Sequence, residues 1–197
     1  MLKGAGVEGE IAVAFKDVLK GLVGTSEIVS VFCNPDDAYK ACVGYVVAVS
    51  DEYFIIQGVT FDGYADGYLL RHYDEIFRLD INGEYEQRLM CLYQKLGQSH
   101  SPFGALGDNL LVSFFEYVLN NQLIVGVGVR DYTENSIYAF VKKIDGEGQM
   151  LTLNDVNDNG KETGGECWIG FDAVKRAAVG SRDEMKLQGL NQAKEMG

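Results

Sequence analysis

The run from Asp155 to Glu166 contains the residues whose types and spacing most clearly suggest chemistry. Its oxygen-bearing side chains stand at alternate positions, Asp155, Asn157 and Asn159, with Gly160 next and Glu166 at the end. This is the pattern of a calcium loop, in which a hard cation takes oxygens at alternate positions, a glycine makes the turn and a carboxylate closes the site. The four oxygen-bearing residues are therefore candidate calcium ligands.

Three features of the surrounding sequence argue against an ion in this loop. The flanking segments have strand patterns instead of helical ones, Glu162 stands where an apolar residue is usual, and the first half of the chain has no equivalent set. A hairpin loop rich in Asn, Asp and Gly has the same composition without an ion. We therefore predict no metal and no cofactor, and the calcium loop is kept as the alternative.

No group of residues typical of an enzyme is present. No serine stands in a GxSxG elbow, no Walker A run occurs, and the carboxylates are scattered along predicted turns. His100 falls in a predicted linker, where a general base would lack rigid support. The sequence therefore predicts a protein that is not an enzyme.

The cysteines and the single tryptophan are predicted to be structural. The four cysteines show no CxxC spacing, and small buried side chains are the commoner role for such residues. A disulfide between Cys33 and Cys42 across a hairpin is the alternative. Trp168 alternates with Cys167 and Ile169 in a strand pattern, and we predict that it belongs to the core.

The charge balance limits the choice of partners. The 197-residue chain has 17 Lys and Arg against 29 Asp and Glu, a formal net charge of −12. Such a chain is repelled by phosphate backbones unless its cations are gathered in one place, so nucleic acid is a disfavoured partner. No apolar run approaches the ~20 residues of a membrane helix, and the first residues lack a secretory signal pattern. We expect a cytoplasmic protein with no membrane partner.

The pattern of residues 43–92 occurs a second time in residues 139–187. An offset of 98 places Asp74 on Asp172 (172 − 74), inside a longer run at that offset. Each copy is predicted to contain a helix, five short strands and a trailing helix. The predicted elements are helix 7–22, strands 28–31, 43–49, 53–59, 68–72 and 75–81 and helix 84–96, then helix 111–119, strands 123–129, 136–144, 149–155, 165–170 and 173–179 and a helix from 181.

A glycine-containing connection with little charge separates the two copies at residues 97–107. Small and polar residues of this kind typically mark a boundary between cores. The predicted domains are therefore a first repeat at 1–96, a linker at 97–107 and a second repeat at 108–197.

A helix followed by five short, strongly bent strands resembles the Sm-like fold, a small barrel related to SH3-like barrels. Gly44 stands where Sm-like proteins often carry a glycine that lets the long second strand bend, and the Asp66-Gly67 turn also matches. The pattern is similar to uncharacterised bacterial proteins with an Sm-like core and a trailing helix. The resemblance implies a mainly β protein with flanking helices, built from two tandem Sm-like or SH3-like five-stranded barrels.

The same resemblance points to three candidate RNA-binding residues. RNA-binding Sm proteins carry basic and aromatic residues near the junction of the fourth and fifth strands, and the matching residues here are Arg71, His72 and Tyr73. These side chains can stack on a base or hydrogen-bond to it. The alternative is structural, with Arg71 paired to a local acid and the two rings completing a barrel edge.

Small barrels have exposed strand edges, which either pair with another strand or must be shielded. We therefore expect a non-enzymatic interaction or assembly protein that contacts a protein partner, or associates with itself, through these edges. RNA binding is the alternative function, although the acidity of the chain disfavours it.

Overall fold

The computed structural model describes residues 5–34, 37–104, 107, 109–130 and 136–195. The chain divides by its internal contacts into unit 1, Met1–Asp66 with Arg71–Phe103, and unit 2, Gly67–Leu70 with Gly104–Gly197. Unit 2 thus resumes at Gly104, within the predicted linker. Positions 105, 106 and 108 of the predicted linker and second repeat lie outside the described residues.

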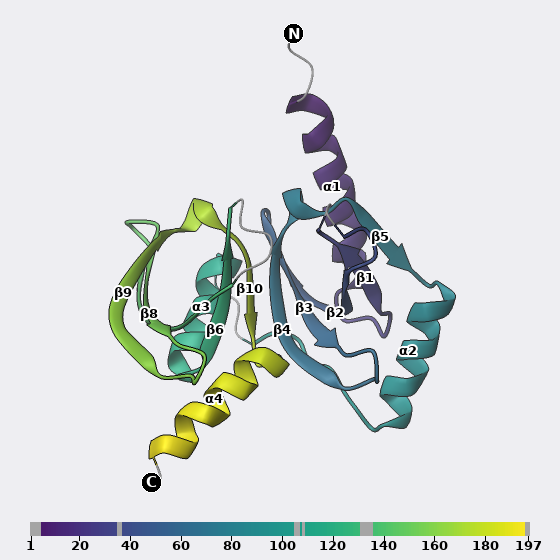
Figure 1. The fold of residues 1–197 in the computed structure, drawn as a ribbon. Helices are drawn as coiled ribbons and strands as arrows, with labels where there is room; N and C mark the ends of the chain where they lie inside the picture. Colours follow the sequence, from purple (N-terminus) through teal and green to yellow (C-terminus); the bar gives the residue numbers. More distant parts are fainter. Residues whose placement is uncertain (1–4, 35–36, 105–106, 108, 131–135, 196–197) are drawn as a thin grey trace. The chain divides into compact units, whose positions relative to one another are not determined.

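Unit 1 is built on an antiparallel sheet with strand order β5-β1-β2-β3-β4, although the middle of β4, Gly67–Leu70, is grouped with unit 2. A long helix precedes the sheet, a 3-10 turn leads into its last strand, and a second helix follows (Figure 1). The elements are α1 (Ala5–Leu22), β1 (Val29–Phe32), β2 (Ala41–Val49), β3 (Tyr53–Val59), β4 (Ala65–His72), η1 (Tyr73–Glu75), β5 (Arg78–Ile81) and α2 (Glu84–Lys95).

The sheet of unit 1 has an apolar cluster on each face because successive strand residues point in opposite directions. On one face, Leu19 of α1 packs in a cluster with Val46 of β2. On the other face, Tyr45 of β2 packs with Leu89 and Tyr93 of α2. The two helices therefore cover opposite faces of the sheet.

Gly44 lies where β2 and β3 approach closely. A Cβ atom at this position would lie 2.0 Å from the backbone oxygen of Gln57 on β3. The register of the β2–β3 pair then shifts between Val46 and Ala48, which marks a bulge. A glycine is thus required for the close approach, and the strand bends just after it.

Unit 2 has strand order β10-β6-β7-β8-β9. Its first helix packs on β7 and its last helix on β6. The Asn109 side chain caps the first helix by accepting a hydrogen bond from the N–H of Val112 at 3.2 Å. The elements are α3 (Leu110–Asn120), β6 (Ile124–Val129), β7 (Ile137–Asp145), β8 (Met150–Val156), β9 (Glu162–Gly170), η2 (Phe171–Ala173), β10 (Val174–Val179) and α4 (Arg182–Glu195).

The prediction of a mainly β protein with flanking helices is confirmed. Neither unit forms a closed barrel among the described residues. In unit 1 the row of strands ends at β5 and β4, which are not neighbours. In unit 2 the row ends at β10 and β9, which are not neighbours either. Three strands are longer than predicted, because β2 begins at Ala41, β4 at Ala65 and β9 at Glu162. Each unit therefore contains an open five-stranded row.

Helical spacing in the segment 84–96 predicts an apolar stripe of Tyr85, Leu89, Leu92 and Leu96, and this prediction is wrong for all of them but Leu89. Tyr85, Leu92 and Leu96 are exposed, whereas Glu86 and Tyr93 are buried together with the correctly predicted Leu89. Helical spacing allows both stripes, and the buried stripe is the one whose tyrosine packs against the ring of Tyr45, with centroids 5.1 Å apart.

Candidate functional site

The outermost strand of unit 2, β9, is the most exposed strand in the described part of the chain. It is nine residues long and pairs with β8 from Glu162 opposite Val156 to Gly170 opposite Met150. It ends the strand row of its unit, so its other side has no neighbouring strand within the described residues (Figure 1). A long edge of this kind presents a line of backbone donors and acceptors to another strand.

Trp168 stands on β9 with 68% of its surface exposed. Our prediction that it belongs to the core is therefore wrong. Its neighbour Ile169 is buried and Cys167 is half-buried, so the alternation along the strand turns the tryptophan outward. The same alternation was visible in the sequence and was the signal that could have placed Trp168 on the surface.

Trp168 lies in a shallow hollow of about 510 Å³ on the outer face of β7, β8 and β9. Thr152 of β8 stands opposite the tryptophan, and Lys143 of β7 stands opposite Thr152. We call this surface the Trp168 patch, and its residues are Lys142, Lys143, Met150, Thr152, Glu166 and Trp168.

The charges of the Trp168 patch are largely matched. Lys142 forms an ion pair with Glu166, and its hydrogen bond is the main reason that the pKa of this carboxyl lies below its usual value. The neighbouring side chain of Trp168 lowers the pKa of Glu166 further, to a smaller extent. The patch therefore presents an aromatic face beside a paired charge, which suits contact with another protein chain.

The candidate RNA-binding residues make contacts within unit 1. Arg71 Nη2 donates to the Sγ of Cys42 at 3.2 Å. The ring of His72 lies edge-on to Tyr53, and its Nδ1 accepts from the N–H of Asp74. Tyr73 is only 4% exposed and packs in the apolar cluster beneath α1, where a base has no access to its ring. These three residues form no common exposed surface.

His100 is placed as a structural side chain, but the prediction that the cysteines are buried is wrong, because Cys91 is exposed and the other three are half-buried. All four cysteines are free thiols, so Cys33 and Cys42 form no disulfide. The ring of His100 stacks on Tyr45 with centroids 3.8 Å apart, and its Nε2 lies 3.1 Å from the backbone oxygen of Thr25. His100 thus helps to hold the segment after α2 against unit 1.

The candidate calcium ligands are divided among β8, a turn and β9. Asp155 lies on β8, and the side-chain oxygen of Asn157 accepts from the N–H groups of Asn159 and Lys161 at 3.0 and 3.2 Å. Glu166 lies on β9 and pairs with a lysine, as described above. In the part of the chain that the structure describes, no three His, Cys, Asp or Glu side chains gather as a metal site.

Comparisons with protein-family models, with curated proteins and with solved structures found no match to this chain. The resemblance to the Sm-like fold therefore stays a prediction. Among the described helices, none is both long and apolar enough to cross a membrane.

Proposed function

We propose that this chain is a non-enzymatic assembly protein built from two Sm-like barrel repeats, and that copies of it associate through the edge of β9. The observation that carries the proposal is a nine-residue edge strand on which Trp168 is 68% exposed. Long exposed edges are normally shortened, covered or charged in proteins that remain monomeric. β9 is neither short nor, within the described residues, covered, and of its two acids, Glu162 and Glu166, the one nearer Trp168 is paired with Lys142.

Three features shared by the two units support a duplicated barrel. The strand orders β5-β1-β2-β3-β4 and β10-β6-β7-β8-β9 have the same connectivity, with the last strand beside the first. Both units have a register shift between their second and third strands. Both also have a 3-10 turn leading into the fifth strand, at η1 and η2.

Trp168 supports association because tryptophan is the residue type most enriched where binding energy is concentrated. Covering its exposed ring would contribute about 2 kcal/mol from apolar area alone. A second copy of the chain is the partner that we propose, because most soluble oligomers are built from identical chains. Backbone pairing along β9 would supply further hydrogen bonds and set the register of the contact.

The test is the molar mass of the particle, measured by light scattering after size exclusion. The wild-type chain should give a multiple of its 21.7 kDa mass. A charge introduced by Trp168→Lys on the edge should shift the particle to monomer. Phe61→Ala is the matched control, because this phenylalanine is 78% exposed but lies in a turn after β3, and it should leave the mass unchanged.

Circular dichroism should show that both variants keep the wild-type fold, since the two replaced side chains are exposed. A wild-type chain that stays monomeric at every concentration would contradict the proposal. A Trp168→Lys variant that assembles as well as the wild type would exclude β9 as the contact.

A further inference from the structure

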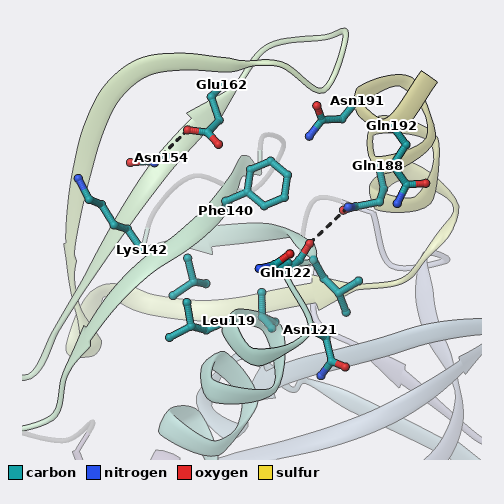
Figure 2. Close-up of a pocket in the computed structure, with 13 residues that line it drawn as sticks. Leu119, Asn121, Gln122, Phe140, Lys142, Asn154, Glu162, Gln188, Asn191 and Gln192 are labelled. Atoms are coloured by element: carbon teal, nitrogen blue, oxygen red, sulfur yellow. Dashed lines mark hydrogen bonds between the residues drawn. The ribbon is translucent and has the colours of Figure 1, made fainter. Parts of the chain in front are cut away.

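A cavity of about 560 Å³ lies within unit 2, and Lys142 lines both this cavity and the Trp168 patch. The end of α3 and the residues after it form one side, β7, β8 and β9 form another, and α4 closes it (Figure 2). Its volume falls within the range of about 300–1,000 Å³ that is typical of small-molecule sites. Its lining, however, is unusually rich in one functional group.

That group is the carboxamide, which both donates and accepts hydrogen bonds. The side chains that supply it come from three different parts of the unit: the segment after α3, strand β8, and helix α4. They are Asn121, Gln122, Asn154, Gln188, Asn191 and Gln192.

Three of these amides are held in place by hydrogen bonds. The oxygen of Gln188 accepts from the N–H of Ile124 at 2.9 Å, and its nitrogen donates to the backbone oxygen of Gln122 at 3.3 Å. Asn154 donates to Glu162 at 3.0 Å, and Asn121 donates to a backbone oxygen at the end of α3. These bonds attach α4 to β6 and give the cavity a defined wall.

The side-chain amides of Gln122, Asn191 and Gln192 make no hydrogen bond to the described part of the chain. Asn191 and Gln192 are adjacent on α4, one turn after the anchored Gln188, and Figure 2 shows them on the α4 side of the cavity. A ligand in the cavity would therefore meet donors and acceptors that no protein group uses, two of them positioned by α4.

The charged groups of the cavity do not favour a charged ligand. Lys142 pairs with Glu166, and Glu162 accepts from Asn154, so one residue of each sign is present and each has a protein partner. A phosphate or carboxylate would find no unpaired cation among the described residues here, and a metal ion would find no group of acids. The lining thus matches a neutral ligand.

The remaining lining is apolar and includes Leu123. Figure 2 shows two other apolar members, Phe140 and Leu119. A neutral sugar has both matching surfaces, because its hydroxyls donate and accept and the C–H groups of its ring form an apolar face. A nucleoside would need its flat base covered on both sides, whereas only one aromatic ring among the described residues lines this cavity. We propose that this cavity binds a neutral mono- or disaccharide.

The test is saturation-transfer difference NMR on the full chain with a panel of small probes. The neutral sugars are glucose, galactose, mannose, N-acetylglucosamine, maltose, cellobiose and lactose, and the comparison probes are glucuronate, uridine, adenosine and trialanine. Saturation should reach the ring protons of at least one neutral sugar and none of the comparison probes.

The double variant Asn191→Ala/Gln192→Ala should bind that sugar with an affinity lower by about tenfold or more, because two hydrogen bonds are lost. Alanine is a strong helix former, so α4 should persist. Gln94→Ala, which removes an exposed amide from α2 in unit 1, is the matched control and should bind the sugar as the wild type does. The proposal is overturned if no neutral sugar is saturated, if only comparison probes are, or if the double variant binds as well as the wild type.

Discussion

Glu86 and Glu184 are buried carboxylates that stand at the third position of α2 and α4. Each accepts a hydrogen bond from a serine hydroxyl, which limits the cost of burying the group. Ser30 on β1 donates to Glu86 at 2.5 Å, and the hydroxyl of Ser181 donates to Glu184. In each unit the acid helps to hold the start of the trailing helix.

The serine comes from a different element in each unit. The position on β6 that matches Ser30 is Gly126 (126 − 30 = 96), and the helix cap that matches Ser181 is Gly83 (181 − 83 = 98). A Cβ at Gly126 would lie 2.9 Å from the carboxylate of Glu184, so a serine there would crowd it. The hydroxyl thus comes from a strand in unit 1 and from a helix cap in unit 2, and each unit has a buried acid beside it.

Burial raises the pKa of Glu184 above its ordinary value, although its bonds from Ser181 oppose the shift. The carboxyl therefore stabilises the fold most when it is protonated, below about pH 4.5, and this contribution is lost as the pH rises through the folded-state pKa. Glu184→Gln keeps an acceptor without the charge. We predict that the free energy of unfolding of this variant relative to wild type rises as the pH increases above about 4.5 and levels off once the pH passes the folded-state pKa of Glu184.

Urea unfolding at a series of pH values measures this difference. Glu116→Gln, which removes an exposed carboxylate from α3, is the control and should show no such trend. If the free energies of unfolding of Glu184→Gln and the wild type differed by the same amount at every pH, Glu184 would be ionised in the folded protein at no cost.

At the scale of the strand, Gly44 is a position where an added methyl group would meet the backbone of the neighbouring strand. A Cβ there would lie 2.0 Å from a backbone atom of β3, which cannot move aside as a side chain can. We predict that Gly44→Ala lowers the free energy of unfolding by about 3 kcal/mol.

The control is Gly189→Ala within α4, where an added Cβ meets nothing within 4 Å. The free energy of unfolding of this variant should rise by about 0.5–1 kcal/mol because alanine is the better helix former. Both values come from urea unfolding of the full chain. A Gly44→Ala variant as stable as the wild type would mean that β2 and β3 do not approach as closely as described.

The elements could be predicted from the sequence where one periodicity dominates. The change from helical spacing to alternation at the end of α1 and the Ser181–Glu184 capping box are local signals, and both correspond to element boundaries. The buried face of α2 could not be predicted from the sequence. It contains Glu86, whose burial depends on a hydrogen bond from Ser30, 56 residues away in the chain. The cavity brings together three separate segments, and no local pattern indicates it.

For the whole molecule, the net charge of −12 is the property that bears most on the choice between assembly and RNA binding. The candidate RNA residues are engaged in unit 1, and their tyrosine is buried. We predict that fluorescence anisotropy of labelled single-stranded RNA does not change on adding the protein at physiological salt. Binding that falls steeply with salt and is lost in Arg71→Ala would instead support the RNA alternative.

Hydrogen exchange along β9, followed by mass spectrometry at low and high protein concentration, tests assembly through this edge most directly. Amides on the unpaired side of an edge strand exchange readily unless another strand covers them. We predict that peptides covering residues 162–170 become protected as the concentration rises, whereas peptides from β3, which lies between two other strands, do not change. Exchange along β9 that is the same at all concentrations, in a sample that nonetheless assembles, would contradict association through this edge.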